Sequence, residues 1–167
     1  MLALKKLYYE KYSKKSYSLS NIDVVINYIF KKIKKGTYID VGCNHPIKYN
    51  TTYLLYKRGW SGINIDADKT SIKLFNEYRK NDYNICNIVS DKSEIKKFYF
   101  YHDRSTVNTL SERLVNSRST KPKKIIEAKS VTLNEIIESS PLKDKKINLL
   151  TIDVEGHELH VLKNFNF

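Results

Sequence analysis

Three short apolar runs, each with a carboxylate at or near its end, constrain the fold more than any other feature of this sequence. The runs lie at 37–41, 62–66 and 149–153, and their acids are Asp40, Asp66 and Asp153. In an open α/β sheet, ligands bind at the edge formed by the carboxyl ends of the strands. Because Gly42 also follows Asp40 by two residues, the pattern predicts a site for a nucleoside-type cofactor.

Strand-like and helical patterns alternate along the chain. Strands are expected at 37–41, 61–65, 84–89, 97–101, 125–131 and 147–152, and helices at 20–35, 52–58, 68–78, 132–140 and 158–165. Ser20 is the expected N-cap of the first helix, with Asp23 at the capping-box position, and Gly36 its left-handed stop. The stretch 103–124 is polar and long enough to be a functional loop. This alternation predicts a parallel sheet with right-handed crossovers.

Three blocks, at 38–66, 87–92 and 152–159, resemble the FkbM family of S-adenosylmethionine-dependent methyltransferases. The likeness runs from about residue 36 to the end, and it includes the order of the blocks, their spacing and the residues within them. It implies an α/β, Rossmann-like class I methyltransferase sheet, mostly parallel, with helices on both faces. It also implies methyl transfer, typically to a hydroxyl oxygen of a sugar or other small hydroxylated acceptor. We therefore expect a basic lead-in at 1–19 and a methyltransferase-like domain at 20–167.

The resemblance implies a sheet that continues with about three further strands after Phe167. With the strand order 3-2-1-4, the fourth strand would be an exposed apolar edge, which favours aggregation. We therefore expect a domain that lacks its C-terminal strands. A fragment, a short natural product and a chain completed by a partner are all compatible with the sequence.

The first turn and the second strand end supply the expected cofactor contacts. Gly42 has no Cβ, so backbone can approach a ligand closely there. The resemblance implies that Asp40 and Gly42 border the methionine moiety, with Asn44 close by; a plain strand-turn is the alternative. Asp66 lies 24 residues after Gly42, near the offset of about 20 residues at which an acid binds ribose hydroxyls. The other role open to Asp66, a helix cap, is better filled by Asp68.

Further cofactor contacts rest on the resemblance. Ser90 and Asp91 match the family position near the adenine amino group, and a surface turn is the alternative for them. The sequence lacks G-x-G-x-x-G, since the next glycine after Gly42 is Gly59, and this weighs against a dinucleotide such as NAD.

Asp153, Glu155 and His157 are the candidate catalytic residues. They alternate, so in an extended chain they would project to one side. His157 has the unperturbed pKa closest to neutral and could take the hydroxyl proton. Asp153 or Glu155 could instead orient the hydroxyl, and Asp153 could also shape the methionine pocket. The alternative for His157 is a helix-start residue bonded to backbone. Together with His160 these residues are of metal-ligand type, but the spacing is not H-E-x-x-H, so we expect no metal site.

Other polar residues are weaker candidates. His45 is a second possible base. Asn108 and Thr109 lie in a stretch similar to a family segment near the substrate. Three arginines in the polar stretch, Arg104, Arg113 and Arg118, could either meet an anionic acceptor or remain solvated.

Charge is uneven along the chain. The net charge is +12, and residues 1–35 carry nine lysines against Glu10 and Asp23, a net charge of +7. Such an arm, with tyrosines interleaved, could bind a polyanion weakly or act as a solvated leader.

The apolar runs are far shorter than the roughly 20 residues of a membrane span. Cys43 and Cys86 have no disulfide or zinc spacing, which favours a cytoplasmic protein. Two alternative functions remain: a non-catalytic cofactor-binding remnant and a nucleic-acid-associated basic protein.

Overall fold

A parallel sheet of four strands forms the centre of the computed structural model, which describes residues 14–166. The strands are β1 (Thr37–Val41), β2 (Ser61–Asp66), β3 (Tyr83–Cys86) and β7 (Leu149–Ile152). Their spatial order is β3-β2-β1-β7, with Ile39 opposite Ile63 on one side and Leu150 on the other. The parallel α/β sheet and its 3-2-1-4 order are therefore confirmed.

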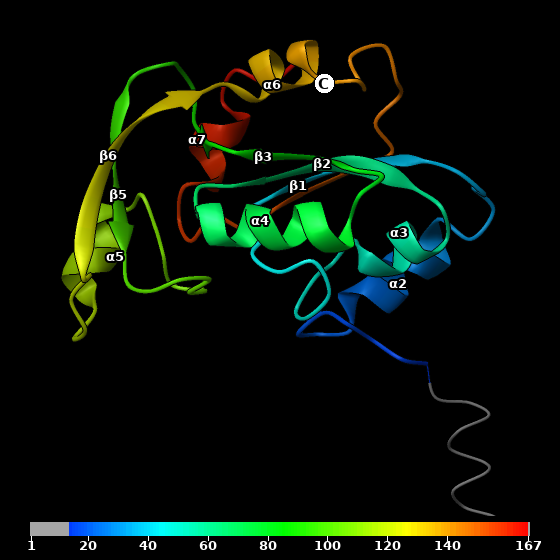
Figure 1. The fold of residues 1–167 in the computed structure, drawn as a ribbon, viewed down its shortest axis with the longest axis horizontal. Coiled ribbons are helices and arrows are strands. Elements are labelled where there is room, and N and C mark those ends of the chain that lie inside the picture. The colour runs from blue at the N-terminus through cyan, green and yellow to red at the C-terminus, as the bar shows by residue number, and fades with distance from the viewer. Residues whose placement is uncertain (1–13, 167) are drawn as a thin grey trace, which may run out of the picture.

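Helices cover both faces of this sheet, as expected (Figure 1). One face carries α2 (Ile22–Ile29), α3 (Tyr53–Lys57) and α4 (Lys69–Tyr78), and the other carries α6 (Leu133–Ser139) and α7 (Glu158–Leu162). The capping residues predicted for two of them are present. Asp68 accepts a hydrogen bond from the Thr70 amide at the start of α4, and Thr132 forms a capping box with Glu135 at the start of α6.

Alternation along the strands divides the core into two parts. On β1, Tyr38 packs with Leu55 and Trp60 beneath α2 and α3, whereas Ile39 packs in the larger cluster that includes Leu133 of α6. These side chains are almost completely buried. Because successive residues of a strand face opposite sides, Asp40 lies on the face of Tyr38, under α3 and α4, and not in the apolar cluster of α6 and α7.

A second, smaller sheet stands at the carboxyl edge of the first (Figure 1). It contains β4 (Ile88–Val89), β5 (Ile95–Phe100) and β6 (Lys124–Val131), in the order β4-β6-β5. The strand predicted at 84–89 is thus two strands in different sheets. The break falls at Asn87, whose amide donates to the Asp66 carbonyl and whose side chain accepts from the Ile88 amide. The predicted loop at 103–124 also contains a helix, α5 (Glu112–Ser117).

The first helix departs from its predicted bounds. Its N-cap is Asn21, and it ends at Ile29 rather than at Gly36, which does not adopt a positive φ. Gly36 instead makes room for the Trp60 ring, which lies 2.6 Å from where a Cβ would stand. The Asp23 carboxylate forms no capping box, because it accepts hydrogen bonds from Ser16 Oγ (2.6 Å) and the Tyr17 amide (2.7 Å).

Residues 14–19 of the predicted lead-in contact the domain. The Tyr17 carbonyl accepts a hydrogen bond from the Asn50 amide (3.1 Å), and the Tyr17 ring packs edge-on against Tyr53 at 4.7 Å. Burial would raise the pKa of Asp23, but its hydrogen bonds from Ser16, Tyr17 and Ser18 outweigh burial and lower it. The rest of the predicted polyanion-binding arm, residues 1–13, lies outside the described residues. Across residues 14–166, no helix has the length and apolarity that a membrane crossing requires.

Candidate functional site

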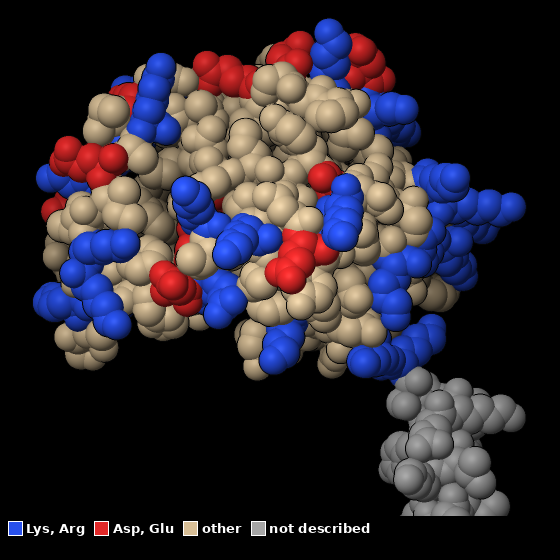
Figure 2. Space-filling model, in the orientation of Figure 1, with Lys and Arg blue, Asp and Glu red and all other residues tan. Residues whose placement is uncertain are grey.

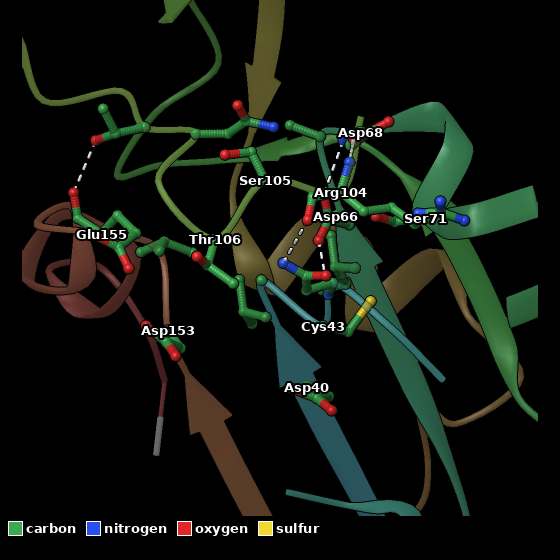
Figure 3. A pocket seen from close by; sticks show the side chains of 18 of the residues that line it. Asp40, Cys43, Asp66, Asp68, Ser71, Arg104, Ser105, Thr106, Asp153 and Glu155 are labelled. Atoms are coloured by element: carbon green, nitrogen blue, oxygen red, sulfur yellow. Dashed lines mark hydrogen bonds between the residues drawn. The ribbon is translucent and has the colours of Figure 1, made fainter. Parts of the chain in front are cut away.

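A cavity of about 490 Å³ lies at the carboxyl ends of β1, β2 and β7. The strand ends contribute Asp40, Gly42, Asn44, Asp66, Asp153 and Glu155 to its lining, and the segment after β5 contributes Arg104, Ser105, Thr106, Asn108 and Thr109. Figure 3 shows Asp66 and Asp68 on one side of this cavity and Asp153 and Glu155 on the opposite side, with Thr106 between them. The topology therefore brings the three acidic strand ends predicted from the sequence to one cavity, which we call the donor cavity.

Asp40 forms the base of the donor cavity and is held by a buried polar network. Its Oδ2 accepts hydrogen bonds from Thr52 Oγ1 (2.9 Å) and Asn50 Nδ2 (3.1 Å). Behind these two residues, Arg79 Nη2 donates to Thr52 Oγ1 (2.7 Å) and to Asn50 Oδ1 (3.1 Å). Burial raises the pKa of Asp40 to about 6, and the Arg79 charge and the two hydrogen bonds act in the opposite direction. Near neutral pH the carboxylate is thus ionised but close to its titration range.

Asp66 joins the ends of β1 and β2. Its Oδ2 accepts from the Asn44 amide (2.8 Å) and its Oδ1 from the Asp68 amide (2.8 Å). An ionised carboxylate offers about four lone-pair positions, so each oxygen keeps capacity for a ligand donor. Burial raises the pKa of Asp66 to about 6, against the lowering effect of its two amide hydrogen bonds. The helix cap itself is Asp68, as the sequence indicated.

Gly42 occupies the tightest point of the site. Its φ is +79°, and a Cβ there would lie 1.9 Å from the carbonyl oxygen of Asp153. Its amide donates to the Ile65 carbonyl (2.8 Å), and the Asp153 amide donates to the Val41 carbonyl (2.9 Å). A residue with a side chain would push these strand ends apart, so the glycine is what allows the loops after β1 and β7 to meet at the cavity.

The segment after β5 closes one side of the donor cavity. The Asp68 carboxylate accepts from the Arg104 amide, and Asn44 Nδ2 donates to the Arg104 carbonyl (3.4 Å). Thr109 Oγ1 donates to the Glu155 carbonyl (2.7 Å), which ties the other end of the segment to the loop after β7. The sequence predicted a functional loop here but did not single out Ser105 or Thr106, because only the tertiary fold places them over the strand ends.

Asp153 and Glu155 form the acidic end of the donor cavity. Burial, together with nearby Glu158, raises the pKa of Asp153; burial and nearby Asp153 raise that of Glu155, with Arg118 acting in the opposite direction. Glu155 Oε2 accepts from Arg118 Nη2 at 2.9 Å. Carboxylates with raised pKa values are better proton acceptors than ordinary surface acids, so this end of the cavity is suited to acid-base chemistry.

The expected alternation of Asp153, Glu155 and His157 in an extended chain is not found. Glu155 and Gly156 both have positive φ values, 54° and 91°, so the chain turns after Asp153. His157 is the N-cap residue of α7 and does not line the donor cavity. Its Nε2 lies 3.0 Å from Ser90 Oγ, and burial lowers the pKa of His157 to about 4.

Ser90 and Asp91, expected beside the adenine, also lie outside the cavity lining, where Asn87 and Ile88 stand instead. Ser90 Oγ donates to Asp91 Oδ1 (3.0 Å), and Asp91 lies 3.7 Å from Lys163. Cofactor binding by Ser90 and Asp91 and catalysis by His157 stay predictions. Within residues 14–166, no group of three or more His, Cys, Asp or Glu side chains could hold a metal ion.

A mostly parallel α/β sheet with helices on both faces, and with a cavity lined by acids at its strand ends, defines the Rossmann-like class to which methyltransferases belong. The family model described as Methyltransferase FkbM domain matches residues 40–167, and the chain therefore belongs to this family. The resemblance seen in the sequence is confirmed, and methyl transfer is the general activity that the family supports. Searches of the curated proteins and of the solved structures gave no match.

Proposed function

We propose that this chain transfers a methyl group from S-adenosylmethionine to a hydroxyl oxygen of a small hydroxylated acceptor such as a sugar. The observation that carries the proposal is the donor cavity, in which Asp66 at the end of β2 faces the acidic pair Asp153 and Glu155 (Figure 3). Its volume of about 490 Å³ falls in the range of about 300–1,000 Å³ typical of small-molecule sites. Membership of the FkbM methyltransferase family supports the methyl-transfer part of the proposal.

The residues around Asp66 fit a nucleoside. Asp66 would accept hydrogen bonds from the ribose hydroxyls, since its two oxygens already orient two amides and keep further lone pairs. Asp40, Gly42 and Asn44 would border the methionine moiety. The bound cofactor supplies a methyl group on a positively charged sulfur, and the acids Asp40 and Asp153 in the same cavity would favour that charge.

The acidic end would accept the proton that the acceptor hydroxyl loses. As the oxygen takes the methyl group, its proton passes to a nearby carboxylate, and Glu155 and Asp153 line the cavity with raised pKa values. Between the two we favour Glu155, because Arg118 holds its Oε2 in a fixed position. For His157 we propose a positioning role in place of the predicted catalytic one, since its ring contacts Ser90 and stacks on His160 and does not line the cavity.

Calorimetric titration with S-adenosylmethionine and its demethylated product, S-adenosylhomocysteine, tests the proposal. Asp66→Ala should weaken binding of both by about 10- to 100-fold, which corresponds to the ~1.5–3 kcal/mol of a hydrogen bond to a charged group. Asp66→Asn keeps one acceptor oxygen and should lose less. Asp144→Ala, an exposed acid outside the cavity, is the matched control.

Two results would contradict the proposal. Unchanged affinity in a folded Asp66→Ala protein would remove Asp66 from the cofactor site. Specific binding of NAD in place of S-adenosylmethionine would assign the cavity to a different class of enzyme.

A further inference from the structure

A second cavity, of about 570 Å³, lies beside the donor cavity, between the end of β5 and the segment that follows α5. Its lining includes Tyr101, Arg118, Ser119, Thr120, Lys121 and Lys123. No Asp or Glu is among its lining residues. Figure 2 shows Lys and Arg side chains gathered at the end of the molecule that holds α5 and the adjoining ends of β5 and β6. The cavity is therefore electropositive and suited to an anion.

Besides its basic residues, the second cavity is lined by Tyr101, which has a buried hydroxyl without a partner in the described part of the chain. Its side chain is 4% exposed, and its hydroxyl has no hydrogen-bond partner among the described residues. Buried hydroxyl groups without a partner are uncommon, because burial removes their hydrogen bonds to water. The Arg118 guanidinium lies 5.7 Å from the centre of the Tyr101 ring. Tyr101 lines the cavity, so a ligand oxygen that reached its hydroxyl from there would supply the partner that the hydroxyl lacks.

Arg118 connects the second cavity to the donor cavity. Its Nη2 donates to Glu155 Oε2 (2.9 Å), and its Nη1 donates to the Val107 carbonyl (2.6 Å). A guanidinium has five N–H donors, and these two contacts leave others for an anion. Glu155 lines the donor cavity and Arg118 the second cavity, so one ion pair stands between them. An anion bound at Arg118 would thus lie close to the residue that we assign as proton acceptor.

We propose that the second cavity binds a phosphate group of the methyl acceptor, so that the acceptor is a phosphorylated small hydroxylated molecule such as a sugar phosphate. This inference rests on the proposed function. A phosphate monoester has three acceptor oxygens and a charge near −2, which match a guanidinium, two lysines and the hydroxyls of Tyr101, Ser119 and Thr120. The methyl group would pass from sulfur to a hydroxyl oxygen of the acceptor and the hydroxyl proton to Glu155, with the phosphate unchanged.

The inference is tested by titrating the chain with glucose 6-phosphate, glucose and inorganic phosphate, followed by amide chemical shifts in NMR spectra. Tyr101→Phe removes a hydroxyl without a partner, so the melting temperature should not fall while glucose 6-phosphate binding weakens by about tenfold. Lys121→Glu should weaken binding at least as much, and more strongly at low salt. Lys73→Glu makes the same charge change on α4, outside both cavities, and should leave binding unchanged.

Each outcome decides the inference. Binding of glucose 6-phosphate but not glucose, with shifts at residues 101–123 and weakening by both Tyr101→Phe and Lys121→Glu, supports it. Unchanged binding in either variant, equal weakening by Lys73→Glu, equal binding of glucose, or no binding overturns it. Inorganic phosphate binding without glucose 6-phosphate binding would assign the cavity to free phosphate and also overturn it. Because these titrations contain no S-adenosylmethionine, their failure is distinguishable from a failure of the Asp66 test.

Discussion

Substitution of Gly42 by alanine tests whether the site is built by close contact between the loops after β1 and β7. Gly42 has a φ of +79°, and the added Cβ would lie 1.9 Å from the Asp153 carbonyl oxygen. The left-handed conformation costs an alanine about 1–2 kcal/mol. Forcing extra volume into a packed position typically costs about 1–3 kcal/mol more. The free energy of unfolding should therefore fall by about 2–5 kcal/mol.

Gly59 is the matched control for this substitution. Its φ is +86°, but a Cβ there would meet nothing within 4 Å. Gly59→Ala should thus cost only the conformational part, about 1–2 kcal/mol. Urea denaturation followed by circular dichroism gives both values, and an unchanged dependence on urea shows that stability alone has changed. Equal losses in the two variants would refute the close contact. A larger loss for Gly42→Ala, together with weaker S-adenosylmethionine binding, is the expected result.

Three other predictions follow from the buried titratable and charged groups. Asp66 has a pKa raised to about 6, so S-adenosylmethionine affinity should fall as its carboxylate is protonated below pH 6, by up to about tenfold per pH unit. Asp40 titrates in the same range, so calorimetry on Asp66→Asn should show a shallower pH dependence than wild type, and an equal dependence would contradict a contribution from Asp66. Burial lowers the pKa of His157 from 6.5 to about 4. On acidification His157 is therefore protonated in the unfolded chain before it is protonated in the folded one. The free energy of unfolding should fall by about 3 kcal/mol between these pH values. Urea unfolding of His157→Gln at pH 7 and 4.5 should show less loss than wild type, and an equal loss would contradict a buried neutral His157. Arg79→Met leaves the buried Asp82 carboxylate, 3.7 Å from the Arg79 Nε, without its cation and should cost about 3–5 kcal/mol; the exposed neighbour Lys80→Met should change stability by less than about 0.5 kcal/mol in the same denaturation assay.

Most residues that line the strand ends of the donor cavity could be predicted from the sequence. Asp40, Gly42, Asp66, Asp153 and Glu155 were predicted from local patterns and Asn44 from the family resemblance, and all six line one cavity. Strand ends are predictable because apolar runs stop abruptly at polar residues, and parallel pairing then brings those ends to one edge. The family resemblance contributed the expectation of a methyl donor, which residue patterns alone did not specify.

Partners from distant segments were not predictable in the same way. Arg79 is completely buried and supports Asp40 through Asn50 and Thr52, yet in the sequence it reads as an ordinary charged residue at a helix end. His157 was expected in an extended segment, but the positive φ values at Glu155 and Gly156 turn it away from the donor cavity. The sequence gives no sign that the Tyr101 hydroxyl lacks a hydrogen-bond partner within residues 14–166, because this depends on which side chains the fold places around it.

The alternation of strands and helices, the parallel sheet and the acids at its edge could be predicted from the order of the residues, because periodicity and the ends of apolar runs are local patterns. Only the folded chain shows which of those residues line a cavity, that Asn87 divides the predicted third strand between two sheets, and that Arg118 stands between two cavities. These features depend on contacts between segments tens of residues apart. Burial then sets the pKa values of Asp40, Asp66 and His157, since desolvation is a property of the folded surroundings and not of the residue type.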